Sequence, residues 1–242
     1  MKPYTFLIVP IILIIIVSCH KEDDPVPPDE IKSIFQATIG GKEVKLVESD
    51  SLISFDDYII AGPSIQKNVG NTDSVIFLIG WETGKPITPD NVTGIIRGPN
   101  ISVNFVHHFD NSRFNDDGAI SYPLFLDIFK EGDRNYSQHF EEEEGVIIEW
   151  LDETGERWTS SKCWISTHFE IPVDPKQNDS HFTVTKSVSL NDKMNDSNHY
   201  QYIELEFGCN LYNSTGELMT IKNAKLSFVF RTFFRIVEPY KF

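Results

Sequence analysis

Apolar and polar residues alternate with a period of two from Ser33 onward, and this pattern most strongly limits the folds open to the chain. In Phe35–Ile39 every second residue is apolar, and Gly40-Gly41 then separates this segment from a similar one at 42–47. Successive side chains of a strand point to opposite faces, so a period of two indicates half-buried strands. The opening of the domain is therefore predicted to be a β-hairpin.

Further segments share a richness in Val, Ile, Phe, Tyr and Thr and are bounded by Gly, Pro, Asn and Asp clusters, as strands are. No window shows a helical period longer than about two turns. We therefore expect an all-β chain, an antiparallel β-sandwich (jelly-roll-like) or a barrel, with residues 33–242 as a single domain. The strand candidates are 58–62, 74–81, 92–97, 101–109, 120–129, 145–151, 157–171, 181–190, 200–212 and 219–236.

Two hairpins can be predicted in register. The sequence WLDETGERW suits a three-residue loop with Gly155 in the left-handed region, which places Trp150 opposite Trp158 as an aromatic cross-strand pair. The same turn chemistry in LYNSTGELM places Leu211 opposite Met219.

The N-terminus has the features of a secretory signal. A single charge, Lys2, precedes an apolar run at 6–17 that is shorter than the roughly 20 residues of a membrane span. Residues 1–18 are therefore expected to be a signal peptide rather than an anchoring helix. Ile16-Val17-Ser18-Cys19 resembles a bacterial lipobox, which implies that Cys19 is lipidated, and residues 19–32 are expected to form a flexible, proline-rich tether.

Several motifs together resemble the surface-exposed lipoproteins of Bacteroidota, a group of uncharacterised function. Lys21, Glu22, Asp23 and Asp24 look like the export signal of that group, and IFQATIGGK at 34–42 looks like its F-x-A-x-I-x-G-K start. Two later stretches fit the same group: GVIIEWLDETGERWTSS at 145–161 and ELEFGCNLYNSTGELMTIKNAKLSFVF at 204–230. The second contains a C-x-L-Y-x-x-x-G motif. The resemblance implies a lipid anchor in the outer membrane, facing the extracellular side, and offers no catalytic residue to carry over.

Two short motifs resemble the O-glycosylation signal of exported Bacteroidota proteins. They are Asp50-Ser51-Leu52 and Asp73-Ser74-Val75, which make Ser51 and Ser74 the candidate modified residues. Ser51, in a polar stretch, is the better candidate, because Ser74 can lie at the start of a strand.

The net charge limits which molecules the chain can bind, and the cysteine content indicates what stabilises its fold. The chain carries a net charge of −15, and removal of Lys2 with the signal peptide leaves −15 − 1 = −16. This balance disfavours nucleic acid and flat docking onto anionic lipid. Besides Cys19 there are only Cys163 and Cys209, so an apolar core must provide the stability.

The segment 157–171, taken as one strand, would place Cys163 and Ile171 on its core face. Trp164, His168 and Glu170 would then share the opposite face and form a candidate ligand-binding site, a ring beside hydrogen-bonding groups. Cys163 and Cys209 would both face the core, either joined as a disulfide or as two separate buried thiols.

No cofactor, metal or catalytic site is predicted. His107 and His108 are adjacent on a strand and so point to opposite faces, and the run Glu141–Glu144 suits a solvated loop. The expected function is non-catalytic binding of an extracellular glycan or protein. The alternatives are an accessory subunit of an outer-membrane surface complex and, less favoured, a hydrolase, which an all-β fold alone does not exclude.

Overall fold

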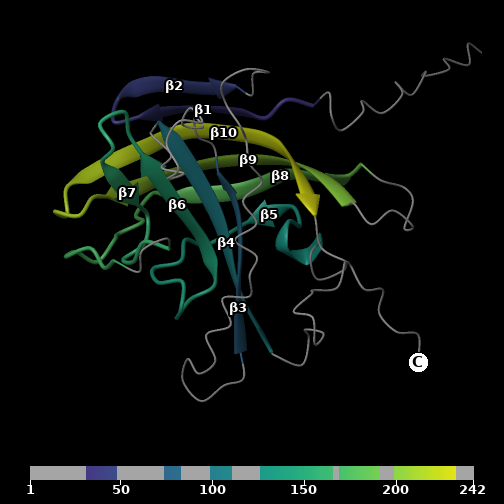
Figure 1. The fold of residues 1–242 in the computed structure, drawn as a ribbon, viewed down its shortest axis with the longest axis horizontal. Helices are drawn as coiled ribbons and strands as arrows, with labels where there is room; N and C mark the ends of the chain where they lie inside the picture. Colours follow the sequence, from purple (N-terminus) through teal and green to yellow (C-terminus); the bar gives the residue numbers. More distant parts are fainter. Residues whose placement is uncertain are drawn as a thin grey trace, which may run out of the picture.

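The computed structural model describes residues 31–47, 74–82, 99–110, 126–165, 169–190 and 199–232, and they form an all-β, antiparallel, sandwich-like fold (Figure 1). The predicted fold class is confirmed. The ten strands are β1 (Ile34–Ile39), β2 (Lys42–Val47), β3 (Ser74–Glu82), β4 (Asn100–Asp110), β5 (Gly132–Asp133), β6 (Gly145–Leu151), β7 (Arg157–Thr159), β8 (His181–Ser189), β9 (His199–Tyr212) and β10 (Leu218–Thr232).

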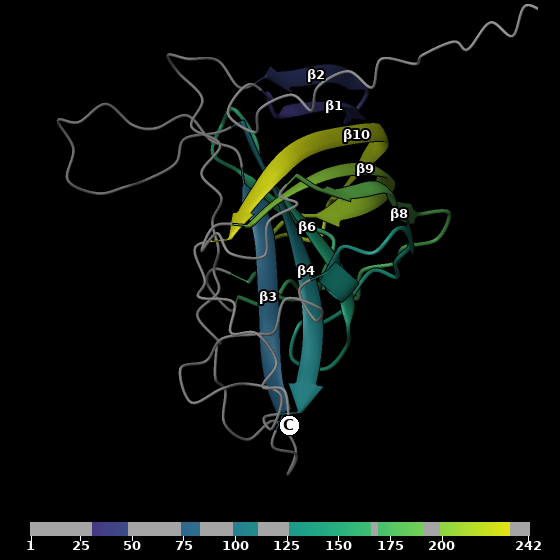
Figure 2. The ribbon, with the colours of Figure 1, turned by 90° about the vertical axis from the view of Figure 1, so that its right-hand side faces the viewer.

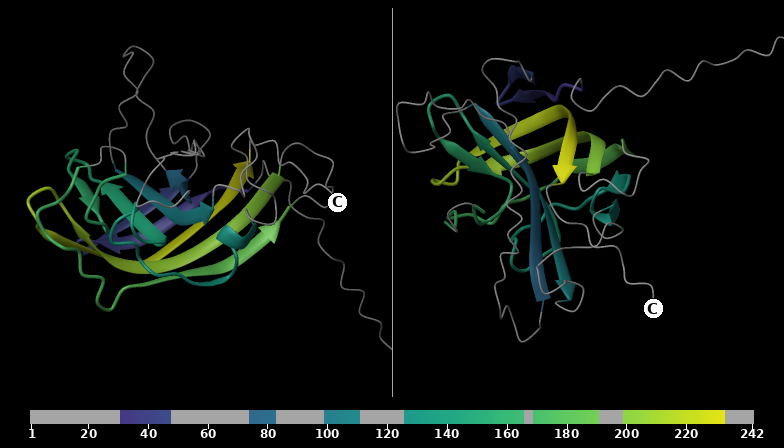
Figure 3. Two further views of the ribbon diagram at one scale, coloured as in Figure 1. Left: turned by 90° about the horizontal axis from the view of Figure 1, so that it is seen from below. Right: turned by 45° about the vertical axis from the view of Figure 1, so that its right-hand side comes forward.

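β9 joins two groups of strands. Along one edge it pairs with β10 over its whole length, and β10 continues the sheet to β1 and β2. Along the other edge it pairs first with β8, up to Gly208, and then with β7 at Tyr212 alone. The order β7-β6-β4-β3 therefore leaves the sheet at one end of β9, and Figures 2 and 3 show these strands crossing the curved face of β1, β10, β9 and β8.

Aromatic rings fill the space between the two groups. Phe105 on β4 meets Phe182 on β8 with ring centroids 5.6 Å apart, and Phe182 stacks on Phe207 of β9 at 5.5 Å. Phe129 packs edge-on against Phe105 at 5.1 Å. Strands that are distant in the sheet order therefore share one core, which is what makes the fold sandwich-like.

A second, smaller core lies on the other side of β6. There the loop segments 137–144 and 162–165 cover β4 and β6. This explains why Val146, Ile147 and Ile148 are buried in succession, since both faces of the strand are covered. The cluster consists of Val106, Phe140, Ile147, Cys163 and Ile165.

Both predicted hairpins are confirmed. Trp150 pairs with Trp158, and Leu211 pairs with Met219. Gly155 has φ +88° and its counterpart Gly216 has φ +86°, the left-handed conformation that the turns require.

Two strand predictions are wrong in their extent. The strand that begins at Arg157 ends at Thr159, because hydroxyls then take over the backbone bonds: Ser160 Oγ accepts the Ile148 N–H at 2.8 Å. Residues 126–128 of the predicted strand 120–129 form a helical turn, which lets the adjacent Ile128 and Phe129 both reach the core. The candidates 58–62 and 92–97, and residues 120–125, lie outside the described residues.

Candidate functional site

Residues 162–165 pair antiparallel with residues 169–171, and we call these two described segments the aromatic hairpin. Cys163 forms an antiparallel bridge with Glu170, the Trp164 N–H donates to the Phe169 carbonyl at 3.0 Å, and the Ile171 N–H donates to the Lys162 carbonyl at 2.8 Å. These bonds fix the base of the hairpin.

This geometry corrects the predicted arrangement of the candidate site. Adjacent residues of a paired segment alternate between faces, so Trp164 shares a face with Phe169, whereas Glu170 shares one with Cys163. Trp164 and Glu170 therefore do not lie side by side on one strand face. His168, the third candidate, lies outside the described residues.

Trp164 and Phe169 form an aromatic pair at the surface. Their ring centroids are 5.3 Å apart with the planes tilted by 39°, and the Arg157 guanidinium lies 5.9 Å from the Trp164 ring centroid. Phe169 is 47% exposed, whereas the other Phe, Tyr and Trp side chains whose burial the structure describes are buried or half-buried. Trp164 is half-buried, and its indole N–H is buried without an acceptor among the described residues.

The base of the aromatic hairpin is held from three directions. The Ile165 N–H donates to Glu149 Oε1 at 2.8 Å, which ties the hairpin to β6. The Lys162 N–H donates to the Gln138 carbonyl at 2.8 Å, and the Lys162 ammonium pairs with Asp174 at 3.1 Å. A surface aromatic pair on such a base is pre-organised for contact with a ligand.

The two cysteines are free, buried thiols, so the structure has the second of the two predicted arrangements. Cys163 belongs to the small core over β6, and Cys209 belongs to the main core. Burial raises the pKa of Cys163 to about 11, with Glu170, Glu141 and Glu149 adding to the shift. Burial raises the pKa of Cys209 to about 12, so both thiols are protonated and unreactive at neutral pH.

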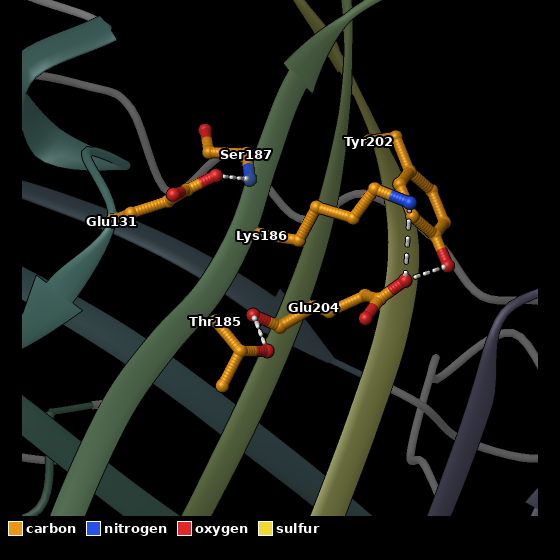
Figure 4. Close-up of polar contacts among 6 residues, drawn as sticks. All are labelled: Glu131, Thr185, Lys186, Ser187, Tyr202 and Glu204. Carbon is orange, nitrogen blue, oxygen red and sulfur yellow. Dashed lines mark hydrogen bonds and ion pairs between the residues drawn. The ribbon is translucent and has the colours of Figure 1, made fainter.

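A second group of polar contacts lies on the outer face of β8 and β9 (Figure 4). The Tyr202 hydroxyl donates to Glu204 Oε1 at 2.8 Å, and the Lys186 ammonium lies 3.6 Å from the same oxygen and 5.1 Å from the Tyr202 ring centroid. Burial and the bond to Glu204 raise the pKa of Tyr202 to about 12. Because the ammonium covers the ring, this face is less suited to stacking than the aromatic hairpin.

His108, one of the two adjacent histidines, is bound to a loop. The His108 ring donates through Nε2 to the Phe140 carbonyl at 3.0 Å, and the His108 backbone N–H donates to Glu144 Oε1 at 2.9 Å. In the described ranges no group of three or more His, Cys, Asp or Glu side chains is arranged to hold a metal ion.

The remaining predicted sites divide between described and undescribed residues. Ser74 is the first residue of β3, paired with Asp110. Cys19, Ser51 and the segment 21–24 lie outside the described residues. Within the part of the chain that the structure describes, no helix is long and apolar enough to cross a bilayer.

The fold and site thus define an all-β, antiparallel, sandwich-like protein with an aromatic hairpin on its surface. Comparisons with protein families, with curated proteins and with solved structures found no match.

Sequence reasoning missed Phe169 and Arg157 as members of the site. The alternation of a single long strand placed Phe169 on the core face, whereas the structure exposes it. The run Thr159-Ser160-Ser161 was the available signal, because consecutive hydroxyl side chains compete with a strand for backbone bonds.

Proposed function

We propose that this chain is a lipid-anchored, surface-exposed lipoprotein that binds an extracellular glycan through the aromatic hairpin without covalent chemistry. The observation that carries the proposal is the exposed Phe169 ring beside the half-exposed Trp164, on a hairpin base fixed by hydrogen bonds. Aromatic faces bind apolar faces of sugars, and nearby charged groups supply the hydrogen bonds that orient them.

Charged groups of both signs border the aromatic pair. Arg157 lies over the Trp164 ring, and Glu170 is the exposed neighbour of Phe169 along the chain. A guanidinium and a carboxylate can together donate to and accept from sugar hydroxyls. This mixed border supports a glycan better than a wholly apolar partner surface.

Asp152 fits a structural role rather than acid–base chemistry. Burial acts to raise its pKa, but hydrogen bonds from Thr154, Glu156 and Trp158 outweigh burial and lower it. A general acid needs the opposite shift. Asp152 is therefore assigned to the turn that it holds together.

The test of binding is a glycan-array screen with Phe169→Ala beside the wild type. Because Phe169 is exposed, its truncation should abolish binding and leave the melting temperature almost unchanged. Leu218→Ala is the matched control, since Leu218 is 57% exposed on β10, and it should bind normally. Unchanged glycan binding by Phe169→Ala would exclude this site. If the wild type binds a partner protein and no glycan, the accessory-subunit alternative is favoured.

The anchor is tested separately from binding. Metabolic labelling with a fatty-acid analogue should tag the wild type, and Cys19→Ala should carry no label, as the lipobox resemblance implies. Replacing Lys21, Glu22, Asp23 and Asp24 with Ala should leave the label in place but protect the protein from protease added to whole cells. Retained label in Cys19→Ala, or unchanged cleavage of the fourfold variant, would contradict the anchor or the export signal respectively.

A further inference from the structure

The chain enters the domain at one end of its longest hairpin. Ile34, the first residue of β1, pairs with Ser227, five residues before the end of β10, whereas Ile39 pairs with Ile221 near the start of β10. Gly40 then follows at the far end, where its N–H donates to the Thr220 carbonyl at 3.0 Å. β1 therefore runs from an entry end toward the turn that joins β9 and β10.

The aromatic hairpin lies near that far turn. Arg157, which contacts Trp164, begins β7, and β7 pairs with β9 only at Tyr212, the last residue of that strand. Val173, two residues after the hairpin, packs against Gly216 in the β9–β10 turn. From Tyr202 to Tyr212 the strand advances roughly 33 Å, at ~3.3 Å per residue. Figure 1 shows β7 and the β9–β10 turn on the left and the β10 arrowhead on the right.

Apolar and aromatic side chains gather on the outer face at the entry end. One row of neighbours crosses β10, β9 and β8 and consists of Val229, Tyr202 and Val188. Ile34 on β1 and Val47 on β2 pair with each other and lie one row away from these three residues. Val188 is 41% exposed and Ile34 is 38% exposed. Val229 is only 7% exposed and the Lys186 ammonium lies over the Tyr202 ring, so we call the three remaining apolar residues, Val47, Ile34 and Val188, the entry band.

We infer that the entry band rests on the lipid surface, which holds the aromatic hairpin at the end of the domain that points away from the membrane. This inference rests on the proposed lipid anchor. From Cys19 to Ile31 the chain has twelve peptide steps, which at ~3.1 Å each in extended form allow no more than roughly 40 Å. The tether enters beside Ile34, so the entry band is the part of the sheet that the anchor brings nearest to the bilayer.

Weak contact is sufficient for this role. The acyl chains hold the protein at the membrane, so the entry band meets lipid at high effective concentration and has only to orient the domain. The net charge of −15 opposes attraction to anionic lipid, so the contact depends on the apolar side chains of the entry band. The carboxylates of Asp152, Glu153, Glu156 and Glu217 lie on the two turns at the opposite end.

The test places a fluorescent probe at each end of the lipidated full chain. Val188→Cys and Thr215→Cys are labelled on proteins reconstituted in phosphatidylcholine vesicles, where the buried Cys163 and Cys209 stay unlabelled. A quencher attached to lipid headgroups should quench the probe at 188 several-fold more than the probe at 215. Equal quenching at the two positions, or stronger quenching at 215, would overturn the inference.

Charge-insertion variants supply the second arm. With a probe kept on Thr215→Cys, Ile34→Asp should allow the domain to tilt and so raise quenching at 215. Leu218→Asp, at a more exposed apolar position at the far end, should not. Flotation with vesicles separates the proposed lipid anchor from the proposed docking surface. A protein that does not float lacks the anchor, which contradicts both proposals. A protein that floats but shows no difference between the ends keeps the anchor and loses only the docking surface.

Discussion

Gln177 takes the place of a strand residue at the junction between β7 and β9. Its Nε2 donates to the carbonyls of Ser160 and Asn210, at 2.9 and 2.8 Å, and its Oε1 accepts the Asn210 N–H at 3.1 Å. One side-chain amide thus completes backbone bonds on both sides of a gap that β7 leaves after Thr159.

Gln177→Glu should therefore weaken the domain. The substitution keeps the shape but removes both donors and turns a carboxylate toward two carbonyls, which should lower the free energy of unfolding by about 1–3 kcal/mol. Urea unfolding at pH 7 measures this loss. Gln36→Glu, on the exposed face of β1, is the control and should change little; equal midpoints for the two variants would contradict the role assigned to Gln177.

His107 should make stability depend on pH. Burial lowers its pKa below 6.5, and Arg134 and His108 lower it further, while Glu144 and Asp127 act in the opposite direction. The unfolded chain therefore binds more protons than the folded one between the lowered pKa and 6.5. The stability that neutral His107 contributes is present above pH 6.5 and is lost as the pH falls toward the folded pKa.

The measurement compares unfolding midpoints at pH 7.5 and pH 5.5 in the wild type and in His107→Gln. The wild type should lose more stability on acidification than the variant, because Gln does not titrate. Other titrating groups affect both proteins alike, so the difference isolates His107. An identical loss in the two proteins would show that His107 is not the group responsible.

At the scale of elements, the chain uses one turn twice. Asp152 and Asn213 each accept, through Oδ1, the backbone N–H and hydroxyl of the threonine two residues on and the N–H of the glutamate four residues on. Asn213 Nδ2 also donates to Glu156 at 2.7 Å and to Glu217 at 2.8 Å. The two turns are therefore held side by side.

The two turn glycines should respond differently to the same substitution. A Cβ on Gly155 would meet no atom within 4 Å, so Gly155→Ala should cost only the left-handed backbone, about 1–2 kcal/mol. A Cβ on Gly216 would lie 2.7 Å from Val173 Cγ1, so Gly216→Ala should cost distinctly more. Thermal unfolding of the two variants measures their losses of stability. Equal losses would contradict the packing of Val173 on the turn.

These turns also show which parts of the fold could be predicted. The pairs Trp150–Trp158 and Leu211–Met219 follow from local turn chemistry, which a short stretch of sequence contains in full. The reversal after Thr159 depends on Gln138, Glu149 and Ile148, which are distant or on another strand. Alternation alone could not distinguish that reversal from a longer strand, and the candidate site was misplaced for the same reason.

For the whole molecule, the shared core shows which strands pack together better than the sheet order does. β4 and β8 are not neighbours in the sheet, yet Phe105 and Phe182 are in contact, and the main cluster draws residues from both groups of strands. The predicted sandwich could be inferred from the strand pattern, but the branching at β9 could not, because a strand pattern does not state which edges pair.

The direction of β1 has a mechanical consequence. A ligand held at the aromatic hairpin and an anchor attached before Ile34 would pull β1 along its own length, so its bonds to β10 and β2 would be loaded together in shear. Pulling between Ile34 and Val47, which are paired at the same end, would instead open the β1–β2 bonds one at a time. Single-molecule pulling should therefore require a higher force between residues 34 and 169 than between residues 34 and 47, and the reverse order would contradict it.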